Sequence, residues 1–167
     1  MRTSLSFLLI ALGSLIMACA DDDYAQSPAS STPTPVASGG FLTVLFEGAS
    51  GQKELIVELA DSPEERHMGL RNRQSMDANR GMLFAWPKDS TSAFGMPETY
   101  IPLTIAFIQE DGTIVHLDDM EPLTTNPHRS PEPYRYAVET NQGWFASNGI
   151  GVGDIAAVPK DAAAEAR

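Results

Sequence analysis

The stretch that decides the fold is Thr104-Ile105-Ala106-Phe107-Ile108-Gln109-Glu110-Asp111-Gly112-Thr113-Ile114-Val115-His116-Leu117. Two apolar runs flank the pair Asp111-Gly112, and Asp-Gly in that setting is the strongest short-range signal for a β-hairpin. Both faces of the run 105–108 are apolar, which favours a strand in the middle of a sheet. The stretch therefore predicts an antiparallel hairpin with strands at 104–109 and 113–117.

Further short strands are predicted on both sides of this hairpin. Apolar periodicity and flanking turn residues indicate strands at 42–46, 53–60, 81–86, 92–96, 134–140 and 154–158. Pro87 is expected to end the strand at 81–86, because proline cannot donate a hydrogen bond to a neighbouring strand. Since turns join most of these strands, we expect an α+β, mostly β domain: a compact, mainly antiparallel curled sheet or small barrel with one or two short helices.

Two short helices complete the expected fold. Ser62-Pro63-Glu64-Glu65 combines a capping serine, a proline suited to the first helical position and acids near the positive helix end. This pattern predicts a helix that runs to about Arg71 or Arg73, with Met68 facing inward. A second helix is expected at 142–148, ended by Gly149, and both Trp86 and Trp144 are expected to anchor the core.

The N-terminus is typical of an exported protein. Arg2 precedes the apolar run Leu5–Ala18, which is shorter than the roughly 20 apolar residues that span a membrane, so a cleaved signal peptide is indicated. Ile16-Met17-Ala18-Cys19 resembles the lipobox of bacterial lipoproteins. That resemblance implies removal of residues 1–18, acylation of Cys19 with palmitate-like chains, and a place on the periplasmic face of the outer membrane or elsewhere in the cell envelope. An ordinary signal peptide with an incidental cysteine, or a short membrane anchor, is the alternative.

The rest of the chain divides into three expected segments. Residues 19–40 form a lipidated cysteine and disordered tether, because the Pro- and Ser-rich run 27–35 has little apolar surface to bury. Residues 41–159 have the length of one globular domain, and residues 160–167 are expected to be a frayed tail.

Composition limits the partners. The formal net charge of -11 becomes -12 when residues 1–18 are removed, since Arg2 is their only charged side chain. Such an acidic chain is not suited to nucleic acid, which binds through Lys and Arg. Cys19 is the only cysteine, so the domain has no disulfide and no thiolate nucleophile or thiolate metal site. The expected partners are the membrane, through the lipid anchor, and a small molecule, a glycan or another envelope protein, with no cofactor.

Over residues 54–158 the chain resembles the bacterial and archaeal family called domain of unknown function 192. The resemblance is carried, in order along the chain, by Val57–Ala60, Glu65-Arg66, Met68-Gly69-Leu70, Arg73, Gly81–Phe84, Phe94, Met96, Thr99, Ile101–Leu103, Ile105–Ile108, Gly112, Met120–Pro122, Tyr136–Glu139, Gly143-Trp144 and Gly153-Asp154. It implies a compact, mostly β fold with a helix. The family's activity is not established, so the resemblance implies no mechanism.

The chain departs from the family pattern at its most motif-like segment. Family members usually show Phe-Trp-Met-Lys-Asn-Thr and then Pro-Leu-Asp. This chain instead has Phe94-Gly95-Met96-Pro97-Glu98-Thr99 and Pro102-Leu103-Thr104. The loss of a bulky aromatic residue and a cation implies either a different ligand or the loss of a shared activity.

The same segment supplies the main binding candidates, because loops between strands often carry binding residues. They are Phe94, Met96, Glu98, Thr99 and Tyr100, with Arg73 and Glu139 added from elsewhere. A structural corner that packs Phe94 and Met96 inside is the alternative. Glu139 lies in an apolar strand, so it is expected to be a buried partner of Arg66 or Arg73.

The leading hypothesis is a binding or accessory module, and whether the chain is an enzyme stays open. The sequence has no Gly-x-Ser-x-Gly, phosphate-binding loop or His-Glu-x-x-His motif. One alternative is an envelope hydrolase that uses Glu98 or Glu139 as acid or base. Another is a metal site that involves His116, Asp118 or Met120. An oxygen-rich cation site would use His116 and Asp118 in the acidic segment that also holds Asp119 and Glu121. A copper(I) site would use thioether and imidazole ligands from His67, Met68, Met82, Met96, His116 and Met120. Filling of the core is the competing role for the methionines.

Overall fold

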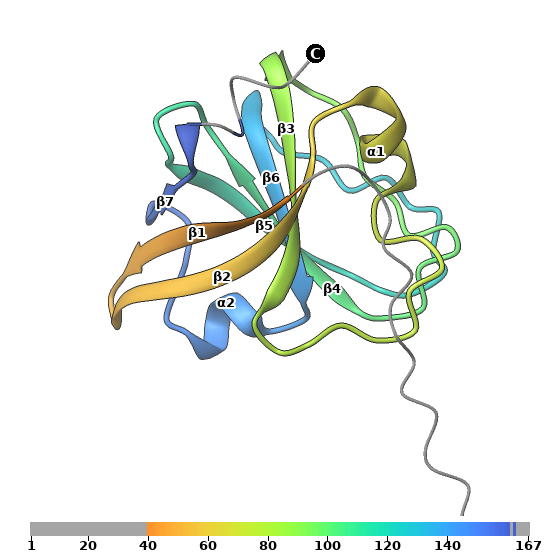
Figure 1. Cartoon of the computed structure of the whole chain (residues 1–167), viewed down its shortest axis with the longest axis horizontal. Coiled ribbons are helices and arrows are strands. Elements are labelled where there is room, and N and C mark those ends of the chain that lie inside the picture. Colours follow the sequence, from red (N-terminus) through yellow and green to blue (C-terminus); the bar gives the residue numbers. More distant parts are fainter. Residues whose placement is uncertain (1–39, 161, 163–167) are drawn as a thin grey trace, which may run out of the picture. The chain divides into compact units, whose positions relative to one another are not determined.

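Seven strands form one mixed sheet in the order β5-β4-β6-β3-β2-β1-β7 (Figure 1). The structure is a computed structural model that describes residues 40–160 and 162. Its elements are β1 (Phe41–Gly48), β2 (Gly51–Ala60), α1 (Pro63–Met68), β3 (Arg80–Ser90), β4 (Leu103–Ile108), β5 (Ile114–Met120), β6 (Tyr134–Asn141), α2 (Trp144–Ser147) and β7 (Ile155–Ala157). The predicted signal peptide, Cys19 and most of the predicted tether lie outside the described residues.

The predicted hairpin is present as β4 and β5. The two strands are antiparallel, from Leu103 opposite Met120 to Ile108 opposite Ile114. Every residue of β4 is buried, and β6 pairs with its other edge. The mostly β fold with short helices is thereby confirmed.

One strand pair is parallel. β2 and β3 run in the same direction, with Ile56 opposite Arg80 and Ala60 opposite Phe84, whereas the other strand pairs of this sheet are antiparallel. A parallel connection must cross over the sheet, and here α1 and the turns after it make that crossing. This crossover brings α1 beside β3, where the candidate site lies.

The sheet is curled but not closed. An isolated bridge joins Thr113, the residue before β5, to Ile155 of β7. The Ala156 amide donates to the Gly112 carbonyl over 2.8 Å. Gly112 is required here, because its φ is +93° and an added Cβ would lie 2.6 Å from the Ala156 oxygen.

The prediction that Pro87 ends its strand is wrong. β3 continues to Ser90, and its register against β6 is interrupted between Ala85 and Ser90. Pro87 lies within that irregularity, where proline is tolerated because no regular ladder hydrogen bond is lost. The strand predicted at 92–96 is reduced to a single bridge between Phe94 and His128.

Both helices are shorter than predicted. Ser62 and Glu65 form a capping box at the start of α1, but the helix ends at Met68, before Gly69, whose φ is +51°. The prediction that Met68 faces inward is wrong, because this short helix has no buried residue and Met68 is 43% exposed. α2 instead buries both Trp144 and Phe145.

Apolar residues cover both faces of the sheet. The first cluster includes Phe46, Val138, the α2 aromatics and the buried Ala162. The second cluster lies on the other face of β3, β4 and β6 and includes Leu70, Met96 and Ile101 from the long loops. These loops lie with α1 on one side of the sheet in Figure 1. Loops and one short helix therefore cover the second cluster, and a cavity lies among these covering segments.

Candidate functional site

A cavity of about 570 Å³ lies among the segments that cover the second cluster. Its wall is contributed by α1 and the turn after it, by β3, by the loop 92–99, by residues 125 and 127, and by one residue of β6. Small-molecule sites in proteins have volumes of about 300–1,000 Å³. The size of this cavity is therefore suited to a small organic ligand.

Three aromatic rings contribute to the apolar part of the wall. The ring of Phe94 lies 5.0 Å from Phe84 and 6.0 Å from Trp86, measured between centroids, and both pairs are edge-on. Behind them, the buried Tyr134 packs against Trp86 and donates its hydroxyl to the Ser92 carbonyl over 2.8 Å. Burial raises the pKa of Tyr134 to about 12. The neutral phenol thus holds the loop that carries Phe94 against the sheet.

Glu139 is the acidic residue in the cavity wall. It projects from β6, opposite Met82 on β3 and Ile105 on β4, and is only 5% exposed. Its carboxyl has no hydrogen bond or ion pair to any of the described residues. Burial raises the pKa of Glu139 to about 8, because removal from water disfavours the charged form and no cation compensates.

The expectation that Glu139 pairs with Arg66 or Arg73 is wrong. Arg73 donates to the Glu58 carboxylate from both terminal guanidinium nitrogens, and Nη1 lies 2.6 Å from Oε1. Arg66 Nη1 donates to the Asp61 carbonyl and, over 2.8 Å, to the Ala85 carbonyl. Because α1 closely follows β2 and lies beside β3, Arg66 of α1 and Arg73 of the turn after it find their partners on or next to those strands and not on β6.

The structure places three of the sequence candidates in one cavity wall: Phe94, Thr99 and Glu139. Met96 is buried in the second cluster, with 1% of its surface exposed. Tyr100 is 45% exposed and does not line the cavity.

Glu98 and Arg73 lie outside the cavity wall. The Glu98 carboxylate is exposed and accepts a hydrogen bond from Arg71 Nη1 over 3.0 Å. The two acids of the hydrolase hypothesis therefore do not share the cavity: of the carboxylates in the described residues, only Glu139 lines it.

Backbone strain is concentrated beside the cavity. Asn72, Glu98 and Leu123 have φ angles of 63°, 57° and 61°, a conformation that is uncommon in residues other than glycine. The Asn72 amide donates to the Glu98 carbonyl over 2.6 Å, and the Leu123 amide donates to the Thr99 carbonyl over 3.1 Å. Three loops are thus tied together through strained positions, which is a common property of ligand-binding regions.

Sequence reasoning did not group Arg66, His67 and Trp86 in one binding site, although all three line the cavity. The guanidinium of Arg66 lies over the Trp86 ring, 5.4 Å from its centroid. Trp86 is half-buried in the wall rather than fully inside the core. No spacing in the sequence indicates this set, because the parallel pairing of β2 and β3 is what brings α1 to β3.

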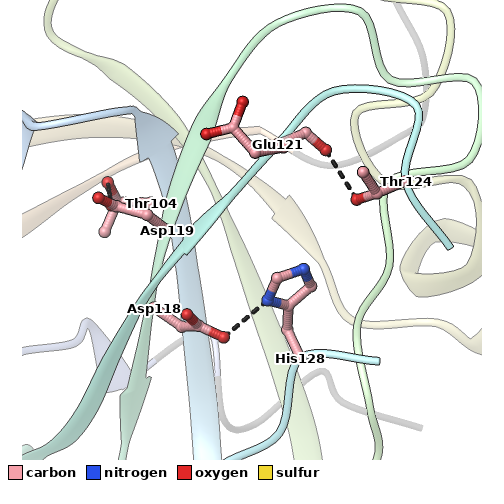
Figure 2. A network of polar contacts seen from close by, with 6 residues as sticks. All are labelled: Thr104, Asp118, Asp119, Glu121, Thr124 and His128. Atoms are coloured by element: carbon pink, nitrogen blue, oxygen red, sulfur yellow. Dashed lines mark hydrogen bonds and ion pairs between the residues drawn. The ribbon is translucent and has the colours of Figure 1, made fainter. Parts of the chain in front are cut away.

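The acidic end of β5 forms a polar network instead of an ion site (Figure 2). Thr104 Oγ1 donates to Asp119 over 2.6 Å, whereas Asp118 accepts from His128 Nδ1 over 2.6 Å on the other side of the strand. Thr124 Oγ1 donates to the Glu121 carbonyl over 2.8 Å.

The residues of the metal hypothesis have other neighbours. The ring of His116 stacks on Phe107 with a centroid distance of 5.9 Å. Met120 is completely buried in the second cluster, and Asp118 is engaged by His128. Across the residues that the structure describes, no three His, Cys, Asp or Glu side chains are grouped to hold a metal ion.

The fold and the cavity together define a small, mostly β domain whose curled sheet carries an aromatic pocket with a buried acid. The chain belongs to the DUF192 family, described as "Uncharacterized ACR", whose model matches residues 45–158.

Two solved structures are similar to the chain. A protein from Sinorhizobium meliloti 1021, described as a candidate transcription regulator, is 34% identical and has a TM-score of 0.70, over 73% of this chain and 96% of that one. A protein of unknown function from Novosphingobium aromaticivorans DSM 12444 is 28% identical and has a TM-score of 0.71, over 75% of this chain and 90% of that one. A search of curated proteins gave no match.

Proposed function

We propose that this chain is a lipid-anchored binding module of the bacterial cell envelope, which holds a small molecule in the cavity between α1, β3 and the loop 92–99. The observation that carries the binding role is Glu139, a buried carboxyl that faces the cavity without a partner. A buried polar group without a partner costs stability. A ligand that satisfies this group accounts for its presence, whereas core packing alone does not.

Binding is favoured over hydrolysis by the composition of the cavity wall. Glycoside hydrolysis commonly needs two carboxyl groups that face each other across the substrate. Glu139 has no second carboxylate opposite it among the described residues of the wall, and Glu98 is held at the surface by Arg71. The volume of about 570 Å³ favours a small molecule over a glycan chain or a protein segment.

The envelope location is supported by the sequence around Cys19 and by the Pro- and Ser-rich run that follows it. Acylation of the cysteine supplies membrane affinity of about 0.8 kcal/mol for each buried methylene group, and more than one chain is needed for stable anchoring. Among the described residues, no helix has the length and apolar character needed to cross a membrane.

The binding role is tested by a thermal-shift screen of small molecules on the purified full chain. A ligand that binds only the folded protein raises the melting temperature by mass action. Gly95→Trp is the control, because a Cβ at Gly95 has only ordinary contacts, the nearest being 3.6 Å to Pro97 Cδ, and the new side chain enters the cavity wall. We expect the shift in the wild type and its loss in Gly95→Trp. An equal shift in both proteins places binding elsewhere, and no shift with any compound contradicts the proposal.

A further inference from the structure

We propose that the cavity selects ligands carrying a protonated amine, which binds the Glu139 carboxylate while the apolar part of the ligand packs against Phe84, Trp86 and Phe94. This inference rests on the proposed function and assigns the chemical class of the ligand.

The first support is the position of the acid. Glu139 is more than nine-tenths buried, and its carboxyl lines the cavity. Its neighbours across the sheet, Met82 and Ile105, are apolar and offer it no hydrogen-bond donor. The carboxyl therefore has unused acceptor capacity on the side that a ligand would occupy.

The second support is the engagement of the surrounding cations. The other ionisable side chains of the wall are Arg66, His67 and Arg71, all from α1 or the turn after it. Arg66 binds main-chain carbonyls and lies over Trp86, and Arg71 binds Glu98. His67 is exposed, and among the described residues no hydrogen bond or ion pair joins it to Glu139. No cation of the described residues neutralises the acid, so the complementary charge is left for the ligand.

The third support is the aromatic lining. Aromatic ring faces attract cations, and sites that combine rings with an acid are suited to ammonium groups. An ammonium group also brings up to three N–H donors, which match the unused acceptors of one carboxylate. An anionic ligand has neither advantage, and a neutral alcohol has only one donor.

Binding of an ammonium group is coupled to the loss of a proton from the Glu139 carboxylic acid. In the free protein at neutral pH, burial keeps most of Glu139 in the neutral carboxylic acid form, because the pKa is raised to about 8. When the ammonium group binds, the carboxylic acid loses its proton to the buffer and N–H···O hydrogen bonds form. The amine keeps its own proton throughout.

The test compares three probes of similar shape on the full chain: 2-phenylethylamine, 2-phenylethanol and phenylacetate. Isothermal titration at pH 7, in two buffers of different ionisation enthalpy, measures both affinity and the protons released. We expect the amine to bind about 10-fold or more tighter than the alcohol, with release of close to one proton, because charge-assisted hydrogen bonds are about twice as strong as neutral ones. Phenylacetate should not bind.

Two variants test whether Glu139 is the source of the preference for the amine and of the proton release. Glu139→Gln should remove both the preference for the amine and the proton release, while the binding of 2-phenylethanol is retained. Glu54→Gln is the matched control, because Glu54 is an exposed acid of β2 that lies outside the cavity wall. It should leave all three affinities unchanged.

A wild-type pH profile keeps the test independent of how well Glu139→Gln folds. Between pH 6 and 8, the affinity for the amine should rise by up to about tenfold per pH unit as Glu139 ionises, and it should level off above pH 8. The rise of affinity with pH should persist in His67→Gln, whatever the absolute affinity of this cavity-wall variant, because Glu139 is retained.

The outcomes separate this inference from the proposed function. Equal affinity for the amine and the alcohol, with no proton release, overturns the selection of amines and leaves the cavity as a binding site. Binding of library compounds without any binding of the amine overturns it in the same way. If no compound of any class binds the cavity, the proposed function fails as well.

Discussion

Arg73 and Glu58 form a bidentate ion pair, with Nη1 of the arginine 2.6 Å from Oε1 of the glutamate. Both side chains are largely covered, with 18% and 21% of their surfaces exposed. The pair ties the turn after α1 to β2, and it engages Arg73, one of the two cations that the sequence offers as partners for Glu139. Because this pair engages Arg73 outside the cavity, Arg73 does not neutralise the Glu139 carboxyl inside it.

Arg73→Ala should lower the free energy of unfolding by about 1–3 kcal/mol, because the partly buried Glu58 carboxylate loses its partner. Arg73→Lys should recover only part of this loss, since an ammonium group cannot reproduce the two parallel hydrogen bonds of a guanidinium. Urea denaturation followed by circular dichroism measures both values. Equal stability of the alanine variant and the wild type would show that the pair contributes nothing.

The stability of the protein should fall as the pH rises because of Glu139. The pKa of this carboxyl is about 8 in the folded state and has its ordinary value of 4.5 in the unfolded state. Between these two values the folded state binds more protons than the unfolded state, so the free energy of unfolding decreases by up to about 1.4 kcal/mol per pH unit. Below pH 4.5 both states are protonated and the penalty is absent, and above pH 8 the penalty is complete.

Glu139→Gln removes this dependence, because an amide does not ionise. Denaturant curves at pH 4.5, 6, 7.5 and 9 should show that the variant gains stability relative to the wild type as the pH rises. Curves whose separation stays constant across this range would rule out titration of Glu139 as the cause.

The Asp118–His128 pair should hold the loop that closes one side of the cavity. The His128 and Phe94 amides each donate to the other residue's carbonyl over 2.9 Å, so loosening the His128 side chain exposes both amides. Asp118→Ala should therefore speed hydrogen exchange at these two amides, measured by nuclear magnetic resonance. Asp119→Ala is the matched control, because it breaks only the contact with Thr104 on the other side of β5 (Figure 2). The same acceleration in both variants would point to general destabilisation of β5.

Cys19→Ser should release the protein from the membrane fraction, because no acyl chain can then be attached through sulfur. Labelled palmitate should be incorporated by the wild type and not by the variant. Ser27→Ala in the predicted tether keeps Cys19 and should leave the protein with the membranes. Retention of Cys19→Ser in the membrane fraction would contradict the lipid anchor.

The parts of the fold that were predictable from sequence depend on local signals. The β4–β5 hairpin follows from two apolar runs and one Asp-Gly turn, and the capping box at Ser62 follows from four adjacent residues. The passage of β3 through Pro87 was not predictable, because it depends on an irregular register with β6, which is distant in the sequence. The early end of α1 likewise reflects the turn that the chain makes at Gly69.

The candidate site was predictable only in part, for a similar reason. Phe94 and Thr99 come from a motif-like loop, and Glu139 attracts attention as an acid in an apolar strand. Trp86 and Arg66 enter the wall because β2 and β3 are parallel, which places α1 over β3. The missing partner of Glu139 was not predictable, since it depends on which carboxylate and carbonyl groups the arginines reach first.

The position of β1 in the sheet has a mechanical consequence. The described chain enters the sheet at β1, which is hydrogen-bonded to β2 along its whole length and to β7 at residues 45–47. Tension transmitted from a membrane attachment would reach Phe41 first, where β1 is paired with β2 alone, and would be shared with the β7 ladder only from residue 45 onward. A domain tethered in this way would open first between β1 and β2, whereas Glu139 lies on β6, two strands beyond β2 in the sheet.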